Sequence, residues 1–286
     1  MTAALWMIGA IVSFSAMAIG GRAVASELDT FELMMYRSFI GIALVVGIAT
    51  AAGTLGSIST QNMKLHLTRN LSHFAGQNLW FAAISMIPLA QVIALEFTSP
   101  IWIALLAPIF LNETLTRLRM LVALLGFVGA IIVARPDFNN VDLGVVLAAT
   151  AAIGFAGSAI FTKLLTRREE ITSIMFWLTV MQALFGVVCA GLDGDVAVPS
   201  AAVLPWVIVV AVTGLAAHFC LTTALSYAPA TIVMPFDFAR LPVIALIGVW
   251  LYSEALEWPV ILGACIIFGA NYLNIAAETQ RNKARP

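Results

Sequence analysis

The chain has 286 residues, of which 62% are apolar and only 10% are charged. Soluble proteins carry about 45–50% apolar and about 25% charged residues, so the composition excludes an ordinary soluble domain and indicates an all-α membrane protein. The net charge of −1 leaves no basic surplus for a nucleic-acid partner, and the three cysteines lie singly in apolar runs. We therefore expect neither nucleic-acid binding nor a metal or cofactor site.

Membrane-length apolar stretches run through the whole chain. A hydrocarbon core about 30 Å thick needs roughly 20 apolar residues per helix, and short polar or Pro- and Gly-containing breaks divide the sequence into ten such stretches. They cover residues 3–21, 30–51, 66–86, 89–111, 115–134, 142–162, 171–191, 203–226, 230–251 and 257–276. This predicts ten transmembrane helices, the first of which is retained and not cleaved as a signal peptide.

The placement of the basic residues indicates an orientation, because lysine and arginine collect in cytoplasmic loops. Only Arg22 and Arg135 fall on one side of the predicted bundle. Ten fall on the other, namely Lys64, Arg69, Arg117, Arg119, Lys163, Arg167, Arg168, Arg281, Lys283 and Arg285. The asymmetry predicts a multi-pass protein of the cell inner membrane with both termini in the cytoplasm.

An ungapped internal match at an offset of 141 residues relates the first five spans to the last five. FAAISMIP (81–88) aligns with TTALSYAP (222–229), and EFTSPIWIAL (96–105) aligns with DFARLPVIAL (237–246). The same offset pairs Arg22 with Lys163 and Glu113 with Glu254. Because each copy holds an odd number of spans, the second copy enters the membrane from the opposite side. The sequence therefore predicts two inverted five-helix repeats, residues 1–141 and 142–286.

The segment ALEFTSPIWIALLAPIFLNETLTRLRMLVALLGFVGAIIVARP (94–136) and its partner MPFDFARLPVIALIGVWLYSEAL (234–256) resemble the EamA branch of the drug/metabolite transporter superfamily. The resemblance covers nearly the full length and includes a Glu-x-Leu motif after the fourth and ninth spans. It implies a ten-helix basket that carries small metabolites. The strings at 69–81 and 218–238 are similar to alphaproteobacterial-type members, and riboflavin or S-adenosylmethionine uptake is found among relatives.

Polar side chains inside the predicted spans point to a central site, because a charged group there costs a few kcal/mol or more unless it is paired or wetted. Glu96 and Asp237 each follow a span-end proline by eight residues, which places them about 12 Å from opposite membrane faces. We expect one aromatic-lined cavity for a small polar or amphipathic metabolite. Its candidate residues are Glu96, Asp237, Arg240, Gln77, His218, Trp80, His73, Arg37 and Trp102.

These residues also have structural interpretations. Asp237 and Arg240 are three residues apart on one helical face, where they can neutralise each other. Glu96 has no basic neighbour on its own span, so its structural partner would be Arg37 from the second span. Arg37 could instead extend to the membrane interface, and the histidines could serve helix packing.

The motifs favour a gradient-driven secondary transporter that works by alternating access. No GxxxxGK[ST] motif is present for ATP, and no HExxH or GxSxG motif for catalysis, so we expect no enzyme. A passive facilitator or channel would share the polar cavity but would not need two inverted halves. A carboxylate in the cavity could carry a coupling proton, or it could stay paired with arginine and serve binding alone. The sequence leaves these alternatives, the direction of transport and the oligomeric state open.

Overall fold

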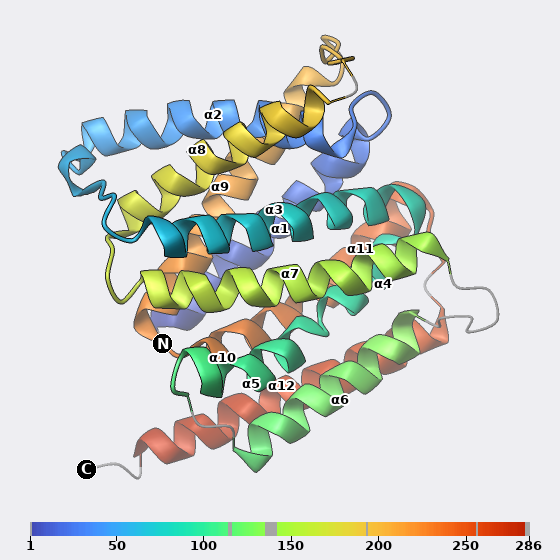
Figure 1. Cartoon of the computed structure of the whole chain (residues 1–286). Coiled ribbons are helices and arrows are strands. Elements are labelled where there is room, and N and C mark those ends of the chain that lie inside the picture. Colours follow the sequence, from blue (N-terminus) through green and yellow to red (C-terminus); the bar gives the residue numbers. More distant parts are fainter. Residues whose placement is uncertain (1, 114–115, 135–141, 193, 256, 284–286) are drawn as a thin grey trace.

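The computed structural model describes residues 2–113, 116–134, 142–192, 194–255 and 257–283. All regular structure in these ranges is helical, and it forms ten rods that alternate in direction (Figure 1). Eight rods are continuous helices, and a short 3₁₀ turn, η1 (Leu55–Ser57), lies between the second and third rods. The eight are α1 (Thr2–Val24), α2 (Thr30–Ala51), α3 (Met63–Met86), α6 (Arg117–Ala134), α7 (Leu143–Leu165), α8 (Ile171–Ala190), α9 (Leu204–Tyr227) and α12 (Trp258–Lys283).

The fourth and ninth rods are broken in the middle. The fourth consists of α4 (Leu89–Glu96) and α5 (Ser99–Phe110). The ninth consists of α10 (Ala230–Val233), the 3₁₀ segment η2 (Met234–Ala239) and α11 (Arg240–Tyr252). The ten rods confirm the predicted spans to within a few residues at most ends. Thr114, Leu115 and Leu256 of the two Glu-x-Leu motifs lie outside the described residues, as does the segment 135–141 before the predicted repeat boundary.

Seven of the rods are long and apolar enough to cross a membrane by length and composition, counted over the described residues. The third rod, α3, falls short in hydropathy because it carries polar side chains along much of its length, and most of these are buried. In α6 and α12 the apolar part is shorter, at Met120–Val133 and Trp258–Ala270. The chain is therefore a multi-pass membrane protein in which one polar rod is shielded by its neighbours.

Helix packing follows the internal repeat. α3 packs along α7, and α1 packs along α9, which is the same contact shifted by 141 residues. α2 packs on α8 and α6 on α12, so each of these helices contacts its own repeat mate. The fold is thus two inverted five-helix repeats packed about a pseudo-two-fold axis. In this arrangement α1 begins and α12 ends at the same end of the bundle, which we call end A; the opposite end is end B (Figure 1).

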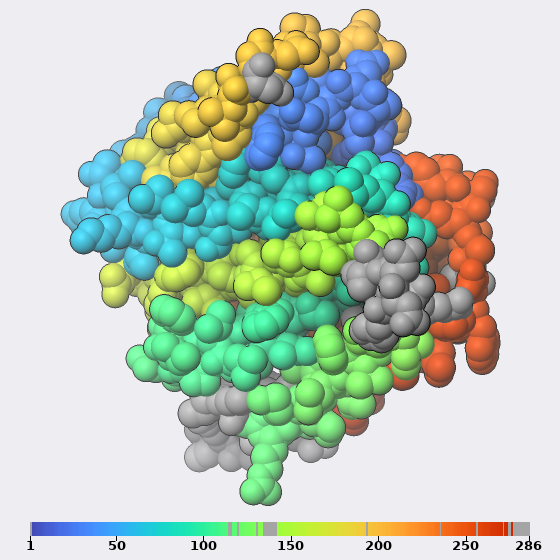
Figure 2. Space-filling model, turned by 45° about the vertical axis from the view of Figure 1, so that its right-hand side comes forward, coloured from blue at the N-terminus to red at the C-terminus, as the bar shows by residue number. Residues whose placement is uncertain are grey.

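Small residues allow a close helix contact between α3 and α7, which lie side by side in Figure 2. A Cβ atom built on Gly154 would lie 2.8 Å from the Cα atom of Gly76, closer than side chains approach backbone. Glycine at both positions lets the two backbones touch, as in other tightly packed membrane helices. This contact holds the polar face of α3 against α7 and away from lipid.

Candidate functional site

The two broken rods meet at the centre of the bundle. α4 ends at Glu96 and α11 begins at Arg240, and the breaks at 96–99 and 237–240 are equivalent under the repeat. The rings of Phe97 and Phe238, which are repeat mates, pack with centroids 5.0 Å apart. Backbone that leaves a helix at membrane depth is tolerated only where it is buried in protein or lines a polar cavity. The crossing of the two breaks is therefore the natural place for a site.

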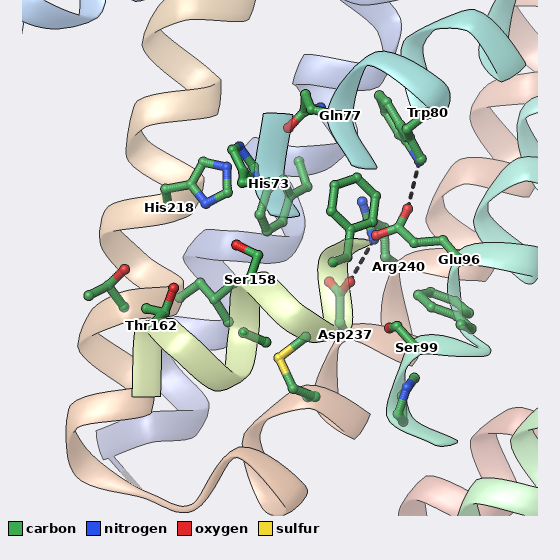
Figure 3. A pocket seen from close by; sticks show the side chains of 18 of the residues that line it. His73, Gln77, Trp80, Glu96, Ser99, Ser158, Thr162, His218, Asp237 and Arg240 are labelled. Atoms are coloured by element: carbon green, nitrogen blue, oxygen red, sulfur yellow. Dashed lines mark hydrogen bonds and ion pairs between the residues drawn. The ribbon is translucent and has the colours of Figure 1, made fainter. Parts of the chain in front are cut away.

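An ionic triad occupies this crossing. The Arg240 guanidinium donates to a carboxylate oxygen of Glu96 and, at 2.6 Å, to Oδ2 of Asp237. Trp80 Nε1 donates to the other Glu96 oxygen at 2.8 Å (Figure 3). The guanidinium also lies over the Phe14 ring, 5.1 Å from its centroid. Two carboxylates share one arginine, so the ionised triad carries a formal charge of −1.

The triad confirms one predicted pair and corrects another. Asp237 and Arg240 pair along their own segment, as their spacing predicts. The predicted pairing of Glu96 with Arg37 is wrong, because Glu96 pairs with Arg240 from the other half of the chain. Arg37 is buried but pairs with no carboxylate of the described residues; its NH1 donates to the Met17 sulfur at 3.8 Å.

Seven of the nine predicted site residues line one cavity, and Arg37 and Trp102 do not. The seven are Glu96, Asp237, Arg240, Gln77, His218, Trp80 and His73. Trp102 lies on α5 and is 37% exposed. The cavity has a volume of about 50 Å³, which is space for a few water molecules. In Figure 3 the two histidines lie on one side of this space and the triad on the other.

Buried polar atoms around the cavity lack partners. The rings of His73 and His218 meet edge to face with centroids 4.5 Å apart. Neither ring nitrogen of His73, nor Nε2 of His218, nor the amide nitrogen of Gln77 has a hydrogen-bond partner among the described residues. Asp237 Oδ1 and Arg240 Nε are also unpartnered. Buried groups of this kind normally have partners, so these atoms are available to hydrogen-bond to water or to a polar ligand.

Sequence reasoning missed Arg69 as a site residue, because it counted this arginine only among the charges of the cytoplasmic side. Arg69 lies on α3, is only 1% exposed and lines the cavity. Its Nε donates to Thr162 Oγ1 at 3.1 Å and its NH1 donates to Asn70 Oδ1 at 2.8 Å. The spacing of Arg69, His73, Gln77 and Trp80 is four, four and three residues, so all four share one face of α3. That spacing is the signal that could have found it.

The cavity extends toward end A and not toward end B. Arg69 and Thr162 line it on the end A side. Their repeat mates on the end B side are Val210, which is fully buried, and Gly21. A Cβ atom on Gly21 would lie 2.4 Å from a ring carbon of Phe81, so no space remains there. Equivalent positions thus line a cavity at one end and form solid packing at the other.

The chain is similar to known membrane transporters over nearly its whole length. Residues 1–135 and 142–276 each match the EamA-like transporter family. The chain is 30% identical over 275 residues to a riboflavin transporter of Brucella anthropi, covering 93% of this chain and 95% of the relative. It is 27% identical over 276 residues to an S-adenosylmethionine uptake transporter of Rickettsia bellii, covering 96% and 93%. A solved crystal structure with 17% identity superposes with a TM-score of 0.78 over 99% of both chains.

Proposed function

Because the chain belongs to the EamA-like transporter family, we propose that it moves a small polar or amphipathic metabolite across the membrane by alternating access, driven by an ion gradient. Riboflavin and S-adenosylmethionine, named in its relatives, are the first cargoes to test. In this proposal the chain binds and releases its cargo without chemical change, so it is not an enzyme.

The observation that carries the proposal is the one-sided cavity at the crossing of two repeat-equivalent helix breaks. Alternating access needs one site that can face either end, and inverted repeats supply two mirrored arrangements of the same contacts. The solid packing of Gly21 against Phe81 at end B disfavours a passive channel, which would need a path to both ends. The present volume of about 50 Å³ is too small for a flavin, so loading requires the repeats, 1–141 and 142–286, to move apart.

The triad is the proposed coupling site. Glu96 and Asp237 share Arg240, and the remaining negative charge can be neutralised by a proton or by a cationic group of the cargo. Proton binding at this site would link cargo movement to a proton gradient. The coupling ion is therefore proposed to be the proton.

The proposed location is the cell inner membrane, with end A and both termini in the cytoplasm. Arg69 and Lys163 are buried in α3 and α7, so they do not belong to the loop charges counted for the orientation. Without these two, the ten-to-two asymmetry of basic residues becomes eight to two and keeps its direction.

The test is uptake into proteoliposomes of riboflavin, S-adenosylmethionine and other small metabolites, each with and without an imposed proton gradient. We expect accumulation of at least one cargo that collapses when the gradient is removed. Glu96→Gln and Asp237→Asn should remove the gradient dependence, while Glu170→Gln, a change of an exposed carboxylate at the start of α8, should not. Wild-type accumulation by both cavity variants across the accessible pH range would contradict the proposal.

A further inference from the structure

We infer that Arg69 forms an anion-binding subsite in the end A part of the cavity, and that the cargo is an elongated amphoteric metabolite with a carboxylate at one end. This inference rests on the proposed transport function and names its substrate class. It assigns the anion-binding role to an arginine outside the triad.

The triad is a poor site for an anionic group of the cargo, because its arginine is already ion-paired. Arg240 already contacts two carboxylates, and the triad as a whole is negative. A carboxylate of the cargo placed there would face the Glu96 and Asp237 oxygens and be repelled. The triad therefore fits a cationic or hydrogen-donating part of the cargo.

Arg69 is the opposite case. It is as deeply buried as Arg240, yet no carboxylate of the described residues lies within ion-pair distance of it. Its guanidinium uses Nε and NH1 for neutral oxygens, and NH2 has no partner among the described residues. A buried cation without a counter-ion is strongly unfavourable, so this end of the cavity is electrostatically incomplete until an anion enters. A carboxylate matches the planar guanidinium best.

The neighbouring side chains also suit an anion. His73 follows Arg69 by one helical turn on α3, and both of its ring nitrogens are unpartnered, as are Nε2 of His218 and the amide nitrogen of Gln77. An imidazole always has at least one N–H to donate, and an amide nitrogen has two. His73 and Gln77 therefore supply N–H donors along α3 between Arg69 and the triad.

The two charged regions are far enough apart to select an elongated molecule. Arg69 and Trp80, which donates to the triad, are eleven residues apart on α3, a rise of about 16 Å. An aromatic wall of Phe14, Phe155 and Trp80 lies along this length. A cargo with a carboxylate at one end and a cationic or aromatic body beyond it would satisfy all three features.

The test measures binding to the purified full chain in detergent with three probes. They are S-adenosylmethionine, its decarboxylated counterpart and neutral riboflavin. We expect removal of the carboxylate to weaken wild-type binding roughly tenfold or more, as for a charge-assisted hydrogen-bonded pair. Arg69→Gln should bind the first two probes with similar affinity, and Arg69→Lys should keep part of the preference. Arg168→Gln, an exposed arginine at end A, should keep all of it.

Failure of the inference is distinguishable from failure of the proposed function. If riboflavin binds and accumulates, and Arg69→Gln and Arg69→Lys leave its affinity and the probe order unchanged, the carboxylate subsite is overturned while transport stands. If the carboxylate preference depends on Arg69 but no cargo accumulates with any gradient, the subsite stands and the transport mechanism is overturned. Equal wild-type affinity for the first two probes also overturns the subsite.

Discussion

Two turns of the chain are built from repeat-equivalent residues: the turn between α3 and α4 at end B, and the turn between α9 and α10 at end A. We call each turn a corner. The two corners differ in one contact, an ion pair that is present at end B. At end B, Arg22 donates to the carbonyl oxygens of Ile84 at 2.9 Å and Ile87 at 2.8 Å, which closes the C-terminus of α3. Glu254 accepts from the Leu89 N–H at 3.2 Å, which caps the N-terminus of α4. Arg22 and Glu254 also form an ion pair with each other.

At end A the same parts recur. Lys163 donates to the carbonyl oxygens of Leu225 at 2.5 Å and Ala228 at 2.9 Å, and Glu113 accepts from the N–H of Thr231 at 3.3 Å and from its hydroxyl at 2.7 Å. Lys163 and Glu113, both described, form no ion pair within 4.0 Å. The guanidinium of Arg22 has five donors in a fixed planar fork and binds two carbonyls and a carboxylate, whereas the ammonium of Lys163 has three donors on one compact nitrogen and binds the two carbonyls.

This difference coincides with the direction in which the cavity extends. Glu254 belongs to the second repeat and reaches a corner of the first, so its ion pair with Arg22 ties the repeats together at end B. At end A the glutamate also crosses between repeats, but only as a helix cap. The cavity extends toward end A, where this tie is absent. We expect the ion pair to hold end B shut, and four predictions test or extend that comparison.

The largest expected effect is on stability. Arg22→Met should lower the free energy of unfolding by about 2–3 kcal/mol, because it leaves the Glu254 carboxylate without its partner. Lys163→Met should cost about 1 kcal/mol, because it removes hydrogen bonds to carbonyls only. Thermal unfolding of both variants in the same detergent measures the difference. Equal losses would mean that the ion pair contributes nothing beyond the carbonyl contacts.

The next effect is on access to the cavity. In a variant whose native cysteines are replaced, Ser158→Cys should react with a membrane-impermeant thiol reagent from end A and be protected from end B, because Ser158 lines the cavity. Adding Glu254→Gln should raise the labelling rate from end B roughly tenfold, the effect of losing about 1.4 kcal/mol of closure. Adding Glu113→Gln instead is the matched control and should not do so. Labelling of Ser158→Cys from end B without the Glu254→Gln change would contradict the expectation that end B is closed.

A smaller effect is expected from making end A resemble end B. Lys163→Arg supplies a guanidinium that can serve the two carbonyls and Glu113 together, which should slow labelling of Ser158→Cys from end A several-fold. Lys64→Arg, an exposed change at the same end, should leave the rate unchanged. Faster labelling in Lys163→Arg would show that the number of donors does not decide closure.

The smallest effect concerns the backbone before each glutamate. Asn112 and Ser253, which are repeat mates, adopt left-handed φ values of 55° and 53°. Ser253→Gly should stabilise the protein by about 0.5–1 kcal/mol, and Asn112→Gly by less, because asparagine tolerates this conformation better. Ala52→Gly, at a right-handed helix end, should stabilise nothing. Thermal unfolding at a lower temperature for Ser253→Gly than for the wild type would contradict the idea that the backbone at Ser253 is strained.

Much of this fold could be predicted from hydropathy and the internal repeat, since every rod corresponds to a predicted span. Counting residues from the span-end prolines, Pro88 and Pro229, gave the membrane depth of the polar side chains. Most of the cavity residues could be predicted in this way, because distance along a helix sets membrane depth. It did not give rotation about the helix axis, so Trp102 was placed in the cavity although it lies outside.

Two further errors came from contacts between distant segments. Glu96 pairs with Arg240 because the two broken rods cross, and no local spacing reports that crossing. Arg69 and Lys163 were counted as loop charges because a basic residue near a span end resembles one. Their burial depends on neighbouring helices that cover them, which hydropathy along a single segment does not describe.

Glu254 and Glu113 each cap a helix of the other repeat, and this has a consequence for a repeat expressed without its partner. In each repeat a helix N-terminus is capped by a carboxylate of the other repeat, Leu89 by Glu254 and Thr231 by Glu113. Neither repeat is therefore chemically complete alone. Since the capping residues occupy equivalent positions, two identical copies of one repeat inserted in opposite orientations would each supply the carboxylate that the other lacks. The capping contacts of the fused chain are thus those that an antiparallel pair of such repeats would make.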